Sequence, residues 1–302
     1  MAKTSGLNTT GILSRVTVAA ITAALVATTT SAMAADAPKG ADRAQAAPSA
    51  SAFNTEAAAD APVNALYGVN SGGDLYGYVP NGEGGLDSRI LTGYGWNYAK
   101  HMTQADHDGD GSSDAVWAVT NGNLEHLPWG GDPVKIGSGW GIYNKVTSAG
   151  NLGGAGADDL LARDTSGNLY LYLGYGNGKL TARKLVGSGW GQYNQITGKG
   201  DLTGDGKADI VARDGAGNLY LYKGTGSSTA PFAGRIKIGG GWNLFNNLVS
   251  VGDIDFDGIT DLIARDTAGA LYLYKGTGNA AGAFKPRVKI GASGWNTYRL
   301  LF

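Results

Sequence analysis

Three short stretches of the chain carry carboxylates at alternate positions, an arrangement that can bind a divalent cation. Each begins with Asp, places oxygen-bearing side chains at positions 1, 3, 5 and 9, and has Gly at position 6. Calcium takes about six to eight hard oxygen ligands, and a tight loop with Gly at its sharpest point can turn alternate side chains toward one ion. The predicted ligands are Asp106, Asp108, Asp110 and Asp114; Asp201, Thr203, Asp205 and Asp209; and Asp253, Asp255, Asp257 and Asp261.

The repetition of this pattern in register favours calcium sites over the alternative, a solvated acidic turn. Carboxylates crowded on one loop repel one another unless a cation lies between them. A related fourth loop has lost the set, because Asn151, Gly153 and Ala155 replace the first three ligands and only Asp159 remains. An EF-hand is disfavoured, since its loop ends in Glu at position 12 and joins two helices. We therefore predict about three structural Ca²⁺ sites.

A repeat of about 50 residues must position these loops, and it is marked by Trp after Gly. The five Trp residues of this kind are separated by 44, 50, 52 and 53 residues. Each unit contains four short apolar segments, clearest in the third copy, where residues 209–214 read DIVARD and residues 218–223 read NLYLYK. Strands that are apolar on both sides are typical of blades packed between neighbouring blades. The sequence predicts an all-β fold, a five-bladed β-propeller with four strands in each blade.

The phase of the repeat predicts how the ring closes. The repeats begin at a second strand near Asn64 and end at a copy of the first strand, residues 296–302. A C-terminal strand that completes the first blade would remove the open sheet edges that invite aggregation. The alternative, an open β-solenoid, gives no reason for the two ends to be out of phase, and it would need atypical capping repeats.

The N-terminal residues predict export. Lys3 and Arg15 precede the apolar residues 16–27, and an A-x-A cleavage site ends at Ala34. The apolar stretch is shorter than the roughly 20 residues of a membrane anchor, which is the alternative. We expect a signal peptide at residues 1–34, a disordered Ala-rich leader at 35–63 and the propeller at 64–302. The expected product is a secreted monomer that does not insert into membranes.

Composition argues against two functional classes. The formal net charge of −1 and the lack of a basic stripe disfavour nucleic acid as a partner. Cys is absent, and the three His residues, at 101, 107 and 126, all lie in the first two units. A pair of Asp residues could still serve glycosidic chemistry, but a metal-ligand role explains the clustered Asp residues better. We expect no enzymatic activity, and we expect His107 at the second position of its loop to point to solvent.

The Gly-Trp segments are the candidate ligand-binding residues. In a four-stranded blade they emerge on the face opposite the acidic loops, together with the turns that begin Arg163-Asp164, Arg213-Asp214 and Arg265-Asp266. Flat aromatic rings near Arg, Asp and Asn suit sugars, whereas the alternative is that Trp packs between blades and Arg-Asp ties turns together. The candidates are Trp96, Asn97, Trp140, Trp190, Trp242, Asn243, Trp295 and Asn296.

Two family resemblances follow from these motifs. The acidic loops and following strands of units one, three and four resemble FG-GAP (VCBS-type) repeats, as in integrin α-subunit propellers, which implies calcium where the two innermost strands of a blade join. The Gly-Trp-Asn segments and the repeat length are similar to tachylectin-2-like five-bladed lectins, although Gly141 and Gly191 stand where Asn is expected. We expect a secreted, lectin-like protein that binds extracellular glycans. The alternative is an extracellular scaffold that binds a secreted or cell-surface protein.

Overall fold

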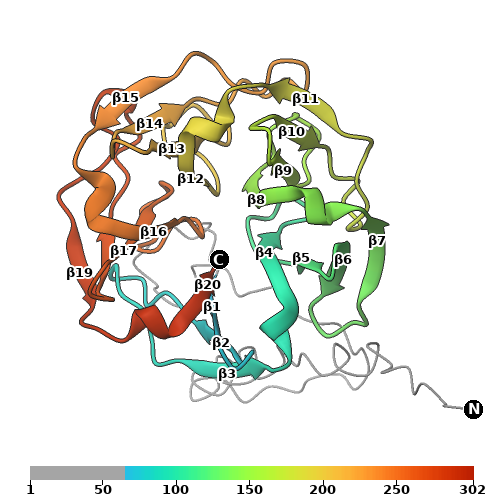
Figure 1. Cartoon of the computed structure of the whole chain (residues 1–302). Helices are drawn as coiled ribbons and strands as arrows, with labels where there is room; N and C mark the ends of the chain where they lie inside the picture. The colour runs from blue at the N-terminus through green and yellow to red at the C-terminus, as the bar shows by residue number, and fades with distance from the viewer. Residues whose placement is uncertain (1–64) are drawn as a thin grey trace, which may run out of the picture.

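The computed structural model describes residues 65–302, which form a ring of five four-stranded antiparallel sheets (Figure 1). The predicted all-β, five-bladed propeller is confirmed. The predicted signal peptide and leader, residues 1–34 and 35–63, lie outside the described residues. Within residues 65–302, no helix has the length and hydropathy that crossing a membrane requires.

Each blade runs from an innermost strand at the ring centre to an outermost strand at the rim. In the first blade these strands are β20 (Tyr298–Leu301), β1 (Leu66–Asn70), β2 (Leu75–Tyr78) and β3 (Ile90–Gly93). In the second and third blades they are β4 (Ala99–Ala105), β5 (Ala115–Thr120), β6 (Asn123–Pro128), β7 (Val134–Ser138), and β8 (Tyr143–Gly150), β9 (Asp159–Asp164), β10 (Leu169–Tyr172), β11 (Lys184–Gly187). In the fourth and fifth they are β12 (Tyr193–Thr197), β13 (Ile210–Asp214), β14 (Leu219–Tyr222), β15 (Ile236–Gly239), and β16 (Phe245–Val249), β17 (Leu262–Asp266), β18 (Leu271–Tyr274), β19 (Val288–Gly291).

The core lies between blades. The Leu residues of the Leu-Tyr-Leu-Tyr strands β10, β14 and β18 are at most 1% exposed, while their Tyr residues are partly buried on the opposite side. One hydrophobic cluster, for example, joins Leu169 and Leu171 of the third blade to Ile196 and Ile210 of the fourth. Burial of apolar surface on both faces of each sheet is therefore the main force that holds adjacent blades together.

A short 3₁₀ turn that starts at Trp leads into each innermost strand. These turns are η2 (Trp96–Tyr98), η3 (Trp140–Ile142), η4 (Trp190–Gln192), η5 (Trp242–Leu244) and η7 (Trp295–Thr297); a further one, η6 (Ala280–Gly282), precedes β19. The Gly before each Trp has a φ between 77° and 87°. Glycine adopts this left-handed conformation without the steric cost that other residues meet, which explains the recurrent Gly-Trp pair.

The C-terminal strand closes the ring, as the sequence predicts. β20 pairs antiparallel with β1, with Gly68 opposite Leu301. Beyond that strand, Tyr67 and Phe302 exchange two backbone hydrogen bonds of 2.8 and 3.0 Å, and their rings stack with centroids 5.6 Å apart. The two ends of the described chain therefore share one sheet.

Hydrogen bonds from cationic side chains also link each blade to the next. Each of five side chains donates to two backbone carbonyls at the Trp turn and first strand of the following blade. These are Arg163 to Trp190 and Tyr193, Arg213 to Trp242 and Phe245, Arg265 to Trp295 and Tyr298, Arg299 to Trp96 and Ala99, and Lys100 to Gly141 and Tyr143. The Arg of the Arg-Asp turns is thus a tie between blades.

Deletion of residues 298–302 tests the closure. It should leave β1 with an unpaired edge and uncover the apolar face against which Phe302 packs, so the shortened protein should melt at lower temperature and aggregate. Differential scanning calorimetry with light scattering measures both effects. A soluble, monomeric protein of unchanged melting temperature would contradict ring closure by β20.

Candidate functional site

The acidic loops lie together on one face of the ring. Each joins an innermost strand to the second strand of its blade, for example β4 to β5 and β16 to β17. Four of these loops line a shared pocket of about 410 Å³, to which they contribute Asp106, Asn151, Asp201 and Asp253 among others. The loops therefore surround one end of the central channel.

Two of the three predicted calcium loops bring carboxylates together. In the first loop, oxygen atoms of Asp106, Asp108 and Asp114 all lie within 4.8 Å of one another, and in the last loop those of Asp253, Asp255 and Asp261 do the same. These are positions 1, 3 and 9 of the pattern. The fifth-position residues, Asp110 and Asp257, are not part of these groups; each accepts a hydrogen bond from the backbone N–H two residues later.

In the last loop, residues 253–261, carboxylates of like charge are buried close together. Burial and the nearby carboxylates raise the pKa of Asp253 and of Asp261 to about 7 each. Burial and the charge of Asp158 raise the pKa of Asp106 in the first loop to about 6. Such shifts mean that the ionised carboxylates lack enough positive charge around them, which a bound cation would supply.

Asp255 is the residue that fits a metal best. Its Oδ1 is buried and has no hydrogen-bond partner within residues 65–302, while its Oδ2 lies 2.6 Å from Lys275 Nζ. A buried, unpaired carboxylate oxygen costs free energy unless it meets a donor or a cation. With the hard oxygen atoms of Asp253 and Asp261 beside it, this loop could hold a divalent metal ion.

The remaining predicted calcium loop, residues 201–209, is arranged differently. Asp201, Asp205 and Asp209 do not form a comparable group of carboxylates among the described residues. Asp205 pairs with Lys223 at 3.1 Å, and Asp201 accepts three backbone N–H groups from its own loop. The side chains lie on one loop, as predicted, but the carboxylates of Asp201 and Asp205, at positions 1 and 5, already bond to donors of the protein.

The ninth-position Asp has a backbone role that sequence reasoning missed. Asp159, Asp209 and Asp261 each accept one N–H from the second residue of their own loop and one from the Gly that follows the third strand. This explains why Asp159 persists where the other ligands are lost. The signal was present in the sequence, because the ninth position alone is Asp in all four loops.

The second loop, residues 151–159, lacks the first three predicted calcium ligands, but it contains one partner of an ion pair. Lys199, from the following blade, pairs with the buried carboxylate of Asp158. Asp158 also accepts hydrogen bonds of 3.0 Å from Ser148 Oγ and from the backbone N–H of Asp106. A lysine therefore supplies positive charge within the second loop.

The prediction that His107 points to solvent is wrong. Its Nε2 lies 2.8 Å from Nε2 of His126, and its ring meets the edge of Trp117 with centroids 5.5 Å apart. The neighbouring third strand presents His126 toward the loop, a tertiary contact that position within a loop does not reveal.

The candidate Trp residues lie at the opposite face, and their rings are packed between blades. Trp96, Trp140, Trp190, Trp242 and Trp295 are only 2–9% exposed. The adjacent Asn97, Asn243 and Asn296 are exposed, and Asn296 donates to the carbonyl of Thr267 at 2.9 Å. A ligand at this face would therefore meet mainly the residues around the Trp rings.

An Arg-Tyr arrangement recurs beside four of these Trp residues. At the Trp295 position, exposed Arg89 lies over the ring of Tyr76 and donates to the hydroxyl of Tyr298, which is also 2.6 Å from the hydroxyl of Tyr78. A pocket of about 390 Å³ opens there. The equivalent sets are Arg183 with Tyr143, Tyr170 and Tyr172; Arg235 with Tyr193, Tyr220 and Tyr222; and Arg287 with Phe245, Tyr272 and Tyr274.

The Trp96 position lacks this arrangement. Ala99 replaces the first-strand aromatic, and Leu127 and Trp129 fill the space beside Trp96. Sequence reasoning identified the Trp residues but missed the Arg residues that precede the outermost strands. Their signal was the repeated Arg next to that strand at residues 89, 183, 235 and 287.

Comparison with known families confirms the FG-GAP resemblance within residues 152–264. Residues 152–212 and 201–264 match the model of the FG-GAP-like repeat. These segments include the acidic loops at residues 201–209 and 253–261. Repeats of this kind are generally calcium-binding. No curated protein matches the chain significantly, and the likeness to tachylectin-2-like lectins is not confirmed.

Several solved structures match the chain at low identity. BBS1N in complex with ARL6DN is 16% identical with a TM-score of 0.39, and the alignment covers 76% of this chain and 64% of that one. AofleA from Arthrobotrys oligospora is 11% identical with a TM-score of 0.46, covering 79% and 74%. The Tc holotoxin pore of Photorhabdus luminescens is 16% identical with a TM-score of 0.38, covering 76% of this chain and 11% of that one. At these TM-scores no function carries over.

The raised pKa values of Asp253 and Asp261 predict how stability depends on pH in a chelator. Because the folded state holds more protons than the unfolded state up to about pH 7, the melting temperature in EDTA should fall as pH rises from about 6.5 to 8. The histidines, whose pKa values are lowered by burial, act in the opposite direction only below this window. Calorimetry on the wild type and on Asp253→Asn measures the slope, and an equal slope in both would contradict this assignment.

Proposed function

We propose that this protein is a secreted, non-catalytic propeller that binds carbohydrate at the pockets between its blades and is stabilised by calcium in its acidic loops. The observation that carries the proposal is the Arg-Tyr arrangement repeated at four of the five Trp turns. The fold and the FG-GAP-like repeats support a binding scaffold in general. Export is supported by the signal-like sequence of residues 1–34.

The chemistry of the pocket at Trp295 suits a sugar. Trp295, Tyr78 and Tyr298 line this pocket and give it an apolar aromatic wall, with 3–9% of each residue exposed. The exposed guanidinium of Arg89 offers several N–H donors, and the Tyr hydroxyls can donate or accept. A few fixed polar groups in an aromatic cavity are typical of small-molecule sites.

Repetition would strengthen weak individual sites. The sets around Arg183 and Arg235 reproduce the hydrogen bond from Arg to a Tyr hydroxyl, at 2.9 and 2.5 Å. At Arg287 the corresponding ring is Phe245, which has no hydroxyl. Several equivalent pockets around one ring favour multivalent binding to a glycan-covered surface.

The proposal also assigns calcium to the acidic loops, where it would stabilise the fold. The carboxylate groups at Asp106 and Asp253 and the unpaired oxygen of Asp255 support it. The loop at Asp201 has the same sequence pattern, so binding there would require Asp205 to leave Lys223. We therefore expect the Asp253 loop to bind first and the Asp201 loop to bind most weakly.

A protein partner is the second candidate, and exposed apolar residues favour it. The last residues of three Trp turns, Tyr98, Ile142 and Leu244, are 50–62% exposed on the same face as the pockets. Apolar side chains presented together on one surface are typical of protein-protein contacts.

Calcium should stabilise the protein measurably. With extracellular-type affinities of about 10⁻⁴–10⁻³ M, 10 mM Ca²⁺ should add roughly 1–3 kcal/mol per site. Calorimetry should show a higher melting temperature in Ca²⁺ than in EDTA, and Asp255→Asn should lose more of that gain than Asp205→Asn. The exposed Asp87→Asn serves as the control. A melting temperature that is the same in both solutions would reject the calcium sites.

Glycan binding is tested on an array with the full-length mature protein. The wild type should bind a defined subset of glycans, and a free sugar should compete. Arg183→Gln and Arg235→Gln together should lower the signal at least tenfold because two of the repeated pockets lose their donor. Lys179→Gln, on the opposite face, should leave the signal unchanged. Binding to a protein with no glycan signal, abolished by Leu244→Glu, would favour the second candidate instead.

A further inference from the structure

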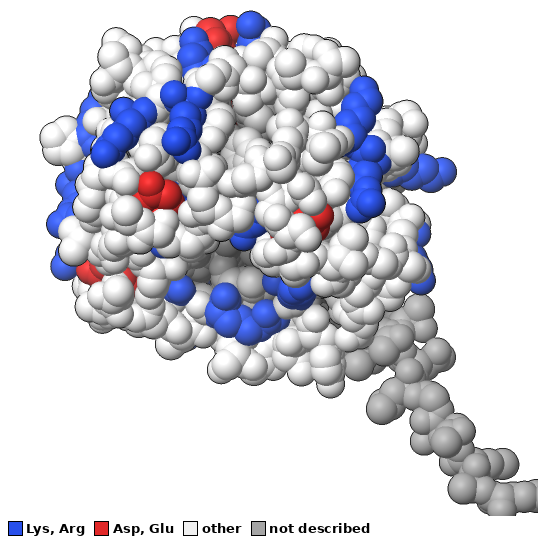
Figure 2. Space-filling model, turned by 45° about the horizontal axis from the view of Figure 1, so that its top comes forward, with Lys and Arg blue, Asp and Glu red and all other residues white. Residues whose placement is uncertain are grey.

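The central channel has positive charge that no carboxylate balances. The five innermost strands, β4, β8, β12, β16 and β20, contain no Asp or Glu, yet they carry Lys100, His101, Lys145 and Arg299. Figure 2 shows Lys and Arg side chains gathered in and around the central hollow of the ring. The charge of the channel wall is therefore opposite in sign to that of the acidic loops.

Lys145 is the least compensated of these cations. It lies on β8 directly opposite Arg163 on β9, a cross-strand pair of like charges. Within residues 65–302 its Nζ has no hydrogen-bond or salt-bridge partner. Burial and the charge of Arg163 lower the pKa of Lys145 to about 8. Like charges placed directly opposite each other in a sheet destabilise it.

The other blades avoid this arrangement. Gln195 lies opposite Arg213, and Asn247 lies opposite Arg265, so a neutral amide occupies the same register position. Gln195 also bridges to the next innermost strand, since its amide donates to the carbonyl of Asn246 and accepts from the N–H of Leu248. Lys145 makes no equivalent bridge, so its presence has no structural explanation in the protein alone.

The surroundings of Lys145 are suited to an anion. His101 Nε2 and Lys100 Nζ lie 3.3 and 2.6 Å from one carbonyl oxygen, that of Tyr143, which begins the same strand as Lys145. Burial, together with the charges of Lys145 and Lys100, lowers the pKa of His101. Lys100, His101 and Arg163 already bond to backbone carbonyls, so among these described residues Lys145 is the cation left without a partner.

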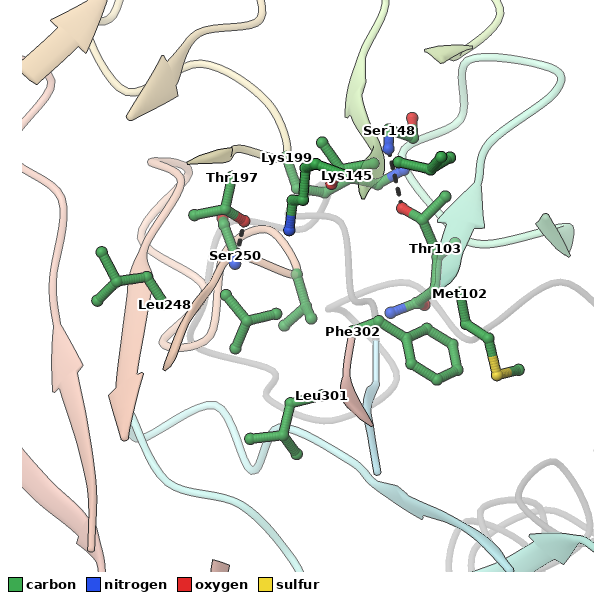
Figure 3. A pocket seen from close by; sticks show the side chains of 15 residues that line it. Met102, Thr103, Lys145, Ser148, Thr197, Lys199, Leu248, Ser250, Leu301 and Phe302 are labelled. Atoms are coloured by element: carbon green, nitrogen blue, oxygen red, sulfur yellow. Dashed lines mark hydrogen bonds between the residues drawn. The ribbon is translucent and has the colours of Figure 1, made fainter. Parts of the chain in front are cut away.

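Lys145 also lines a cavity in the channel, which Figure 3 shows from close by. The cavity measures about 40 Å³, and its 15 lining residues include two lysines and no acidic residue. One of the two, Lys199, is already paired with Asp158. The hydroxyls of Thr103 and Thr197 face this space and accept backbone hydrogen bonds from Ser148 and Ser250. Room for about three water molecules also suffices for one small anionic group.

We propose that the channel binds an oxyanion, a carboxylate, sulfate or phosphate group, in this cavity, with Lys145 as its principal contact. The anion supplies the negative charge that the protein lacks at this position. The ligand is either a free inorganic ion or the acidic group of a sugar. This site is distinct from the pockets between blades and does not depend on them.

The test compares the wild type with Lys145→Gln, which installs the residue type that the next blade has at this position. Isothermal titration with sodium sulfate, sodium phosphate and sodium glucuronate at constant ionic strength measures binding. The wild type should bind at least one of them saturably, and Lys145→Gln should weaken that binding about tenfold or more. Lys179→Met, on a surface hairpin, should bind as the wild type does. Tighter binding of glucuronate than of the inorganic ions assigns the site to an acidic sugar, and the reverse assigns it to a free ion.

The melting temperature in chloride buffer provides a second, independent test of the oxyanion site. If Lys145 awaits an anion, its replacement removes an unpaired charge, and Lys145→Gln should melt at higher temperature than the wild type. A lysine with a purely structural role would give a lower melting temperature instead. The proposal is overturned if none of the three anions binds the wild type, or if Lys145→Gln binds them equally well.

Discussion

The pairing of β20 with β1 is the contact on which the rest of the structure depends. Every blade buries both faces against its neighbours, so an open ring would expose two large apolar faces and an unpaired strand edge. Tyr67 and Phe302 close the ring with backbone hydrogen bonds and stacked rings. The five cationic ties between blades then fix each Trp turn against the preceding blade, which positions the inter-blade pockets. Function at either face therefore requires a complete circle.

The ring separates charge along its axis. At one end, the carboxylates of the acidic loops are buried close together and resist ionisation, as the raised pKa values of Asp253 and Asp261 show. At the other end, burial and neighbouring positive charges lower the pKa values of His101 and Lys145. Both arrangements store unfavourable electrostatic energy in the protein alone. A ligand of opposite charge would reduce this unfavourable energy at either end. The proposed calcium sites and the proposed oxyanion site therefore rest on the same electrostatic argument.

Differences between the repeats carry as much information as their similarity. The second acidic loop has lost its ligands, and Lys199 of the next blade provides a charge for Asp158. The Trp96 position has apolar side chains where the other four have Tyr or Phe with Arg. Lys145 stands where two other blades have an amide. Each departure changes a side chain without changing the backbone frame, so a repeat can acquire or lose a site independently of its neighbours.

The sequence by itself determined the repeat, the number of blades, the closing strand and the acidic loops, because short-range patterns of Gly-Trp, Asp-x-Asp and paired Leu-Tyr encode local turns and strand faces. It could not show that Asp205 is held by Lys223, that His107 meets His126, or that Arg163 bonds to the next blade. Those contacts join residues of different strands or blades, and only the ring brings them together. The tertiary structure also decided that the Trp rings are buried and that the Arg residues beside them are exposed, since exposure depends on the packing of adjacent blades.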